Sequence, residues 1–255
     1  MEQTVVRIRT LEIGSGMPKI CVPVVGKTEK EILEGAERAK AAKPDLVEFR
    51  VDWYEEAADS KKVVALLEKL RKCLGELPVL FTFRSSREGG EAALSDGAYQ
   101  SLNEAAIASG FVDCVDVELF FGDAVVKAVV AAAHSNNVKV IASNHDFEKT
   151  PAAEELLARL QKMEALGADI PKIAVMPQNK KDVLTLLAAT EEMATNYADR
   201  PIITMSMAGT GVISRLCGEV FGSSMTFGAA KKASAPGQMG VNDLNTVLGL
   251  LHNAM

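Results

Sequence analysis

The sequence predicts an α/β fold, a closed (β/α)8 TIM barrel with a short N-terminal β-hairpin. Short apolar segments of strand length alternate with helical patterns over nearly the whole chain, and eight such strands can be counted. This alternation implies parallel strands joined by right-handed crossovers. A chain of 255 residues has the length that eight such units require. No change of composition and no linker divides it, so we expect a single barrel domain over residues 1–255.

The expected elements follow one another with short connections. Residues 4–13 alternate in polarity and stop at Gly14-Ser15-Gly16, which predicts the hairpin. The apolar strands are expected at residues 20–25, 46–51, 79–83, 111–119, 138–143, 170–175, 202–207 and 224–227. Helical patterns separate them at residues 30–42, 61–74, 97–108, 123–136, 152–166, 180–196, 212–217 and 241–251.

An open doubly wound sheet is the alternative to a barrel. Such a sheet usually carries a glycine-rich phosphate loop after its first strand. The corresponding turn here is Val25-Gly26-Lys27-Thr28, which has only one glycine. We therefore prefer the barrel.

The composition excludes several classes of protein. A net charge of −6 argues against nucleic-acid binding, which needs a basic face. No apolar run reaches the length of a membrane span, and the N-terminus has no signal-peptide pattern, so we expect a cytoplasmic protein that does not bind membranes. The four cysteines are far apart and fit neither a zinc site nor a disulfide framework: Cys21, Cys73, Cys114 and Cys217.

Lys172 is the ionisable residue of the sixth strand, Ile170–Val175, whose other residues are apolar. Burial in such surroundings disfavours the charged ammonium form, and a neutral amine can attack a carbonyl carbon to form a Schiff base. A lysine at a strand end can also bend out to water. The other residues near the strand ends decide between these two interpretations.

Polar residues gather at the carboxyl ends of the predicted strands, where TIM-barrel enzymes place their active sites. Taken singly they have structural explanations: Glu48 with Arg50 could form an ion pair, and hydrogen bonding between strands is the main role we favour for Asp116 with Glu118. A lysine, a histidine, arginines and carboxylates at one rim nevertheless predict an enzyme. The group comprises Glu48, Arg50, Arg84, Asp116, Glu118, His145, Lys172 and Arg215.

The chain resembles the type I 3-dehydroquinate dehydratase (3-dehydroquinase) family over nearly its whole length. The most specific part is Asp116-Val117-Glu118-Leu119, followed after a spacer of 20 residues by Val140-Ile141-Ala142-Ser143-Asn144-His145-Asp146. Supporting segments are Glu48-Phe49-Arg50-Val51-Asp52, Phe81-Thr82-Phe83-Arg84, Glu88-Gly89-Gly90 and Gly237-Gln238. One departure is Pro23, where we expect many family members to carry a serine near the substrate; it affects one peripheral contact.

The resemblance implies a lyase of the shikimate pathway and aromatic amino acid biosynthesis. The implied reaction is the third step of the shikimate pathway, the reversible syn-dehydration of 3-dehydroquinate to 3-dehydroshikimate. Lys172 would form an iminium at C3 of the substrate, and His145 would remove the C2 proton and then protonate the departing C1 hydroxyl. The iminium serves as the electron sink, so we expect no metal and no organic cofactor. By analogy with the family we also expect a homodimer.

The resemblance also assigns roles to the residues around the lysine and the histidine. Glu88 would orient His145, and Arg215 would bind the substrate carboxylate. Ser234 and Gln238 would contact the same carboxylate from a loop that can close as a lid. The ring hydroxyls would be bound by Glu48, Arg50 and Arg84, and the apolar wall would consist of Met205, Met207 and Phe227.

Two other functions remain open. A class I aldolase acting on phosphorylated sugars would share the Schiff base, but it would build a phosphate site from the loops after strands seven and eight. A non-catalytic barrel that binds a small acid or a protein would keep the arginines without needing Lys172 and His145 together.

Overall fold

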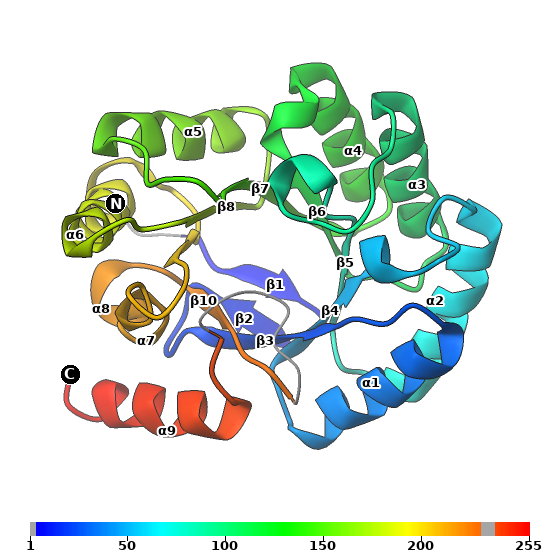
Figure 1. Ribbon diagram of the computed structural model, residues 1–255, viewed down its shortest axis with the longest axis horizontal. Helices are drawn as coiled ribbons and strands as arrows, with labels where there is room; N and C mark the ends of the chain where they lie inside the picture. The colour runs from blue at the N-terminus through cyan, green and yellow to red at the C-terminus, as the bar shows by residue number, and fades with distance from the viewer. Residues whose placement is uncertain (1–3, 231–237) are drawn as a thin grey trace.

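The computed structural model describes residues 4–230 and 238–255. Eight parallel strands form one sheet in the order β10-β3-β4-β5-β6-β7-β8-β9, with the helices packed around it (Figure 1). The two ends of this sheet meet through a bridge between Ile202 and Ser223, and the Ser224 N–H donates to the Ile202 carbonyl at 2.9 Å. The predicted α/β barrel is confirmed, and the open sheet is excluded.

The elements lie close to their predicted positions. The strands are β3 Lys19–Val24, β4 Leu46–Arg50, β5 Val79–Thr82, β6 Cys114–Glu118, β7 Lys139–Asp146, β8 Ile170–Val175, β9 Ile203–Ser206 and β10 Met225–Phe227. The helices are α1 Glu29–Ala41, α2 Ser60–Leu74, α3 Asp96–Ala108, α4 Asp123–Ser135, α5 Ala153–Ala165, α6 Lys180–Glu192, α7 Ile213–Leu216, α8 Gly218–Phe221 and α9 Val241–His252. No helix among these described residues is both long enough and apolar enough to span a membrane.

Three boundaries differ from the prediction by more than one residue. β7 continues beyond residue 143 to Asp146, because its last residues pair with β8 as far as Asp146 opposite Val175. β6 begins at Cys114 and not at residue 111. The predicted helix 180–196 ends at Glu192 and continues as a π-helical turn, Met193–Tyr197, and α8 was not predicted.

Local sequence explains where helices begin. Thr28 precedes α1 and accepts a hydrogen bond from the Glu31 N–H, while the Glu31 carboxylate accepts from the Thr28 N–H. This reciprocal capping satisfies two backbone donors at the helix start. Asp59 and Asn179 accept in the same way from the first N–H groups of α2 and α6.

The inner face of the barrel changes from apolar to polar along five strands, β4 to β8. Side chains alternate between the two faces of a strand, so residues two apart share a face. Leu46 is followed on the inner face by Glu48, Cys114 by Asp116 and Ile170 by Lys172. The apolar members belong to one buried cluster inside the barrel: Leu46, Leu80, Cys114, Ile141 and Ile170. The polar members two residues later are also buried: Glu48, Thr82, Asp116, Ser143 and Lys172.

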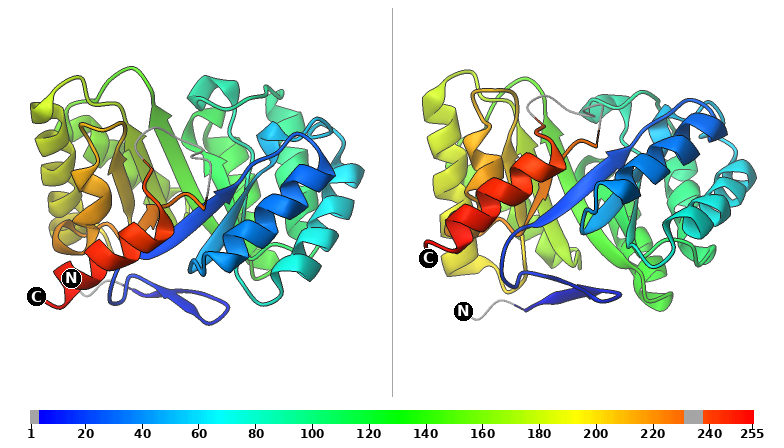
Figure 2. Two further views of the ribbon diagram at one scale, coloured as in Figure 1. Left: turned by 60° about the horizontal axis from the view of Figure 1, so that its bottom comes forward. Right: turned by 90° about the horizontal axis from the view of Figure 1, so that it is seen from below.

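The hairpin closes the N-terminal end of the barrel. β1 Val6–Ile8 pairs antiparallel with β2 Leu11–Ile13, and Figure 2 shows the pair lying across this end. Three of its side chains, Val6, Ile8 and Ile13, are buried in the inner apolar cluster. Because the strands' carboxyl ends lie on the opposite side, the hairpin leaves that side open.

We expect Ile13→Ala to destabilise the protein without altering the open end of the barrel, where the carboxyl ends of the strands lie. Ile13 is fully buried, so truncation leaves a cavity at the barrel's end and should lower the free energy of unfolding by about 2 to 4 kcal/mol. Urea unfolding measures this loss. The control is Arg7→Ala in the same hairpin, whose side chain is 75% exposed and should contribute little. Equal stability of the Ile13→Ala variant and the wild type would contradict the packing role of the hairpin.

Candidate active site

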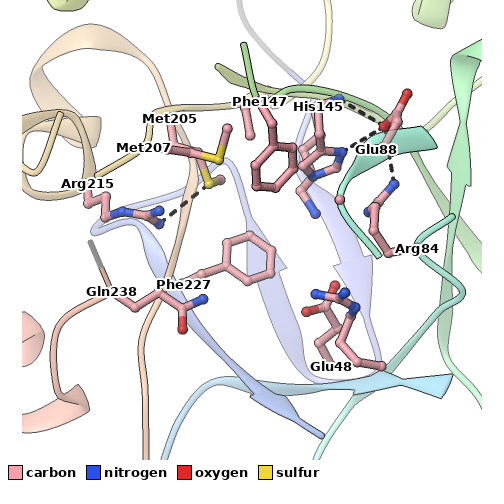
Figure 3. Close-up of a pocket in the computed structure, with 14 residues that line it drawn as sticks. Glu48, Arg84, Glu88, His145, Phe147, Met205, Met207, Arg215, Phe227 and Gln238 are labelled. Atoms are coloured by element: carbon pink, nitrogen blue, oxygen red, sulfur yellow. Dashed lines mark hydrogen bonds and ion pairs between the residues drawn. The ribbon is translucent and has the colours of Figure 1, made fainter. Parts of the chain in front are cut away.

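A cavity of about 200 Å³ lies at the carboxyl ends of the strands (Figure 3). It brings together all the catalytic and binding residues predicted from the sequence except Ser234, which lies outside the described residues. Those lining the cavity are Glu48, Arg50, Arg84, Glu88, His145, Lys172, Met205, Met207, Arg215, Phe227 and Gln238. Pro23 stands beside Glu48 in the register of β3 and β4.

Lys172 is buried on the inner face of β8, with only 3% of its surface exposed. Its Nζ lies 3.3 Å from Asp116 Oδ2 and 4.5 Å from the centre of the Phe227 ring. The surroundings on the inner face are therefore not wholly apolar, because the neighbouring β6 contributes a carboxylate. The amine remains on the wall of the cavity, where it can reach a ligand.

His145 and Glu88 form a hydrogen-bonded pair on the same cavity. His145 Nδ1 lies 2.9 Å from Glu88 Oε2, and the His145 backbone N–H donates to the same oxygen at 2.9 Å (Figure 3). Glu88 lies at the end of a short 3-10 helix, Ser86–Glu88, after β5. With Nδ1 bound to the carboxylate, Nε2 is the ring nitrogen left for a ligand.

The electrostatics of this pair disfavour charge. Burial lowers the pKa of His145 well below its usual value, and the positive charges of Arg84, Lys172 and Arg50 lower it further. Burial raises the pKa of Glu88 to about 8, although the Arg84 guanidinium opposes this. Because one proton can reside on either partner of the shared hydrogen bond, the two groups titrate as a pair. A neutral imidazole is the form that can accept a proton from a substrate.

Arg84 links three strands through buried carboxylates. Its Nη2 donates to Asp116 Oδ1 at 2.8 Å, and its Nη1 donates to Glu118 Oε1 at 2.9 Å and to Ser143 Oγ at 3.0 Å. Asp116 and Glu118 thus hold β5, β6 and β7 together, as the sequence suggested. Burial raises the pKa of Asp116, but Arg84 and Lys172 outweigh this and hold it below its ordinary value.

Glu48 and Arg50 have separate partners. Arg50 makes a two-pronged ion pair with Asp52, with Nε–Oδ1 and Nη2–Oδ2 distances of 2.8 and 2.9 Å. Glu48 accepts a hydrogen bond from Thr82 Oγ1 at 2.9 Å. The ion pair between Glu48 and Arg50 that the sequence allowed is replaced by the pair with Asp52, because the chain turns into a 3-10 helix directly after β4.

Arg215 lies across the cavity from Glu88 and His145 (Figure 3). It comes from the short helix α7, and only 2% of its surface is exposed. Burial lowers its pKa to about 10, which still leaves the guanidinium charged at neutral pH. Beside it are the buried side chains of Met205, Met207 and Phe227, so one wall of the cavity joins a cation to an apolar surface.

Sequence analysis did not identify Phe147, Asn144 or Arg159 as site residues. Phe147 lines the cavity two residues after His145, and its ring packs against Gly89. Gly89 has φ +80°, and a Cβ there would lie 2.4 Å from the Phe147 ring, so this turn requires glycine. The position of Phe147 directly after the histidine motif was a usable signal. Asn144 stands inside that motif, directly before His145, and had the same signal. Arg159 had no such signal, because it comes from a different element, α5.

No group of three or more His, Cys, Asp and Glu side chains within residues 4–230 and 238–255 is placed to hold a metal ion.

Comparison with known proteins identifies the family. The family described as "Type I 3-dehydroquinase" matches residues 20–255. The 3-dehydroquinate dehydratase of Clostridioides difficile (strain 630) is 56% identical over 250 residues, which cover 98% of each chain. That of Listeria innocua is 60% identical over 245 residues, 96% of this chain and 97% of the relative.

Solved structures agree with this match. A crystal structure of type I 3-dehydroquinate dehydratase from Clostridium difficile, with covalently modified comenic acid, superposes with a TM-score of 0.97 at 55% identity and covers 99% of this chain and 100% of that one. The enzyme from Geobacillus kaustophilus has a TM-score of 0.96 at 42% identity, covering 99% and 98%. The matches speak against the aldolase and the non-catalytic barrel. The chain therefore belongs to the type I 3-dehydroquinase family.

Proposed function

We propose that this protein is a 3-dehydroquinate dehydratase, a lyase that converts 3-dehydroquinate to 3-dehydroshikimate and water in the shikimate pathway. The observation that carries the proposal is that Lys172, the His145–Glu88 pair and Arg215 line one cavity. An amine, a neutral imidazole and a guanidinium suit a substrate that has a ketone, an acidic carbon beside it and a carboxylate.

The reaction begins at Lys172. The lysine ammonium gives up one proton, and the resulting amine attacks the C3 carbonyl carbon to form a carbinolamine. Return of that proton to the carbinolamine oxygen lets it leave as water and gives the iminium, as is general for type I enzymes. The positive iminium nitrogen withdraws electrons, so the C2 proton becomes acidic and passes to His145. The resulting enamine returns its electron pair and expels the C1 hydroxyl.

His145 acts twice, first as base and then as acid. The proton that it removed from C2 is delivered to the departing C1 oxygen, so that both groups leave from the same face of the ring. Glu88 holds the Nδ1–H and stabilises the imidazolium between the two steps. Water then hydrolyses the iminium and releases the product and the free lysine. The iminium is the electron sink, and these steps use neither a metal nor an organic cofactor.

The remaining residues bind the substrate. Arg215 would hold the carboxylate, with Gln238 and the predicted Ser234 beside it, and Met205, Met207 and Phe227 would cover the apolar face of the ring. Glu48, Arg50 and Arg84 would bind ring hydroxyls, each steered by a protein partner of its own: Thr82, Asp52 and the carboxylates of β6. By analogy with the family we also propose a cytoplasmic homodimer, which analytical ultracentrifugation and cell fractionation can test.

Borohydride trapping tests the function. The protein is incubated with 3-dehydroquinate, reduced, digested and analysed by mass spectrometry, while the absorbance of the conjugated enone product is followed in parallel. We expect product formation and one reduced adduct on the peptide that contains Lys172. Turnover without an adduct would reject the imine mechanism, and absence of both would reject the proposed function.

Arg215→Met should raise the KM for 3-dehydroquinate by roughly 10²-fold, because a buried charge-assisted pair with the carboxylate is lost. We expect a smaller effect on kcat, since the carboxylate is bound alike in substrate and transition state. Arg215→Lys keeps the charge without the planar fork and should give an intermediate KM. Steady-state kinetics measure both, and an unchanged KM in Arg215→Met would remove Arg215 from this role.

A further inference from the structure

A chain of hydrogen bonds reaches the Glu88–His145 pair from outside the substrate cavity. Arg159, on α5, donates from Nη1 to Asn144 Oδ1 at 2.5 Å. Asn144 donates from Nδ2 to Glu88 Oε1 at 3.0 Å. Asn144 is one residue from His145 on β7 and 1% exposed, and it lines a second cavity, of about 500 Å³, behind the pair.

The order of donors in this chain is fixed by Arg159. A guanidinium can only donate, so the amide oxygen of Asn144 must face it and the amide nitrogen must face Glu88. Turning the amide round would bring two donors against each other. Glu88 Oε1 therefore always meets a donor, and a carboxyl proton on that oxygen would have no acceptor.

The other carboxylate oxygen also receives donors. Glu88 Oε2 accepts the backbone N–H of His145 and lies 2.9 Å from its Nδ1. If Glu88 held a proton on Oε2, it would donate to Nδ1, and the ring would carry its own hydrogen on Nε2. In that tautomer Nε2 cannot accept a proton from a substrate.

We propose that Asn144 and Arg159 are positioning residues of the proposed dehydratase: they keep Glu88 ionised and turned toward the Nδ1–H of His145, so that Nε2 stays free of hydrogen. The inference rests on the proposed function for its kinetic consequence, whereas the tautomer can be measured without substrate. Neither residue lines the substrate cavity, so both act through Glu88.

Asn144 and Arg159 act on the balance between the ionised and the protonated form of Glu88. Burial raises the pKa of Glu88 to about 8, and the hydrogen bond from Asn144 counters this rise. Many charged groups face the pair from the surrounding elements, and the variants below leave all but Arg159 and Arg87 in place. These charged groups are Arg50 at the end of β4, Arg84 after β5, Asp116 and Glu118 on β6, Lys172 on β8, and Arg87, Asp146, Glu148 and Arg159 around the second cavity.

The direction of the expected pH effect follows from the active form. The pair is active when Glu88 is ionised and His145 carries hydrogen on Nδ1 alone, and it is inactivated by one further proton. Loss of the Asn144 donor makes that proton easier to add. The acid limb of the kcat/KM profile should therefore move to higher pH, by about one unit if a hydrogen bond to a charged group is lost.

The variants are Arg159→Met, which removes the guanidinium and keeps an unbranched apolar side chain, and Asn144→Ala, which removes the amide between Arg159 and Glu88. Arg159→Lys retains a donor for Asn144, so the acid limb of its kcat/KM profile should lie close to that of the wild type. The matched control is Arg87→Met. Arg87 lines the same cavity, and its Cζ lies 5.2 Å from the Phe121 ring centre. Arg159 Cζ lies at the same distance from the Phe120 ring centre. The Arg87→Met variant therefore loses the same charge and the same type of ring contact as Arg159→Met.

NMR titration of the imidazole in substrate-free protein is the second readout. The chain has three histidines, so the His145 signals can be assigned against a His145→Gln variant. We expect the wild type to show Nδ1–H, and Arg159→Met and Asn144→Ala to show a higher titration midpoint with an increased Nε2–H population.

Two results would overturn the inference: unchanged midpoints in both variants, or an equal shift in Arg87→Met, which would indicate a general charge effect. If the wild type does not convert 3-dehydroquinate, the proposed function fails, while the NMR titration still decides whether Arg159 and Asn144 set the tautomer.

Discussion

Lys172→Ala is expected to abolish the dehydration of 3-dehydroquinate, with kcat lowered by roughly 10⁴-fold or more, as when other covalent nucleophiles are removed. Alanine cannot form the iminium, and without that electron sink the C2 proton is not acidic enough for His145 to remove. The fold should remain, because Asp116 keeps Arg84 at 2.8 Å and Ser143 at 2.6 Å after the lysine is lost. Enone absorbance measures turnover, and circular dichroism checks the fold.

Lys172→Arg separates chemistry from structure. Arginine keeps a positive charge near Asp116 but cannot form an imine, so this variant should be as inactive as Lys172→Ala. Lys139→Ala is the control for removal of a strand lysine, because Lys139 lies at the opposite end of the barrel in an ion pair with Asp169. Turnover near the wild-type rate in either Lys172 variant would reject the Schiff base.

His145→Ala should slow the reaction by roughly 10²- to 10⁴-fold, the usual contribution of a general acid–base residue. The variant keeps Lys172 and should still form the iminium, so borohydride should trap an adduct with the mass of the unreacted substrate. The wild type should instead yield a mixture with the dehydrated adduct. Intact-protein mass spectrometry after brief incubation distinguishes the two adducts by one water.

His134→Ala is the matched control for His145→Ala. His134 is partly exposed and bonded to Asp169 at 2.9 Å, and Asp169 precedes β8 on the side away from the cavity. We expect normal turnover from this variant. A His145→Ala protein that dehydrates its substrate at the wild-type rate would transfer the acid–base role to another residue.

The strands show how far local pattern predicts the fold. β8 begins and ends where its apolar run does, at Ile170 and Val175, because both of its faces are buried. β7 extends three residues beyond its apolar run, through Asn144, His145 and Asp146. Its end depends on pairing with β8, and a polar strand end gives no hydrophobic signal of that pairing.

The sequence alone predicted the fold class, the end of the barrel at which polar residues gather, and the types of residue that gather there. A period of two along a strand is a property of the extended backbone, so Ile170 and Lys172 had to share a face, as did Cys114 and Asp116. The barrel topology then required the polar members to meet at the carboxyl ends. The family motif around His145 was also visible without coordinates.

Only the tertiary structure decided which partner each of these side chains takes. Arg84 pairs with Asp116 and Glu118, Glu88 with His145, and Arg159 with Asn144, across separations of 15 to 57 residues. Hydrogen bonds depend on distance and angle to within a few tenths of an ångström, whereas the periodicity of a strand or helix specifies only a face. The protonation of the Glu88–His145 pair depends on these partners, so it follows from the packing of β5, β7 and α5 against one another.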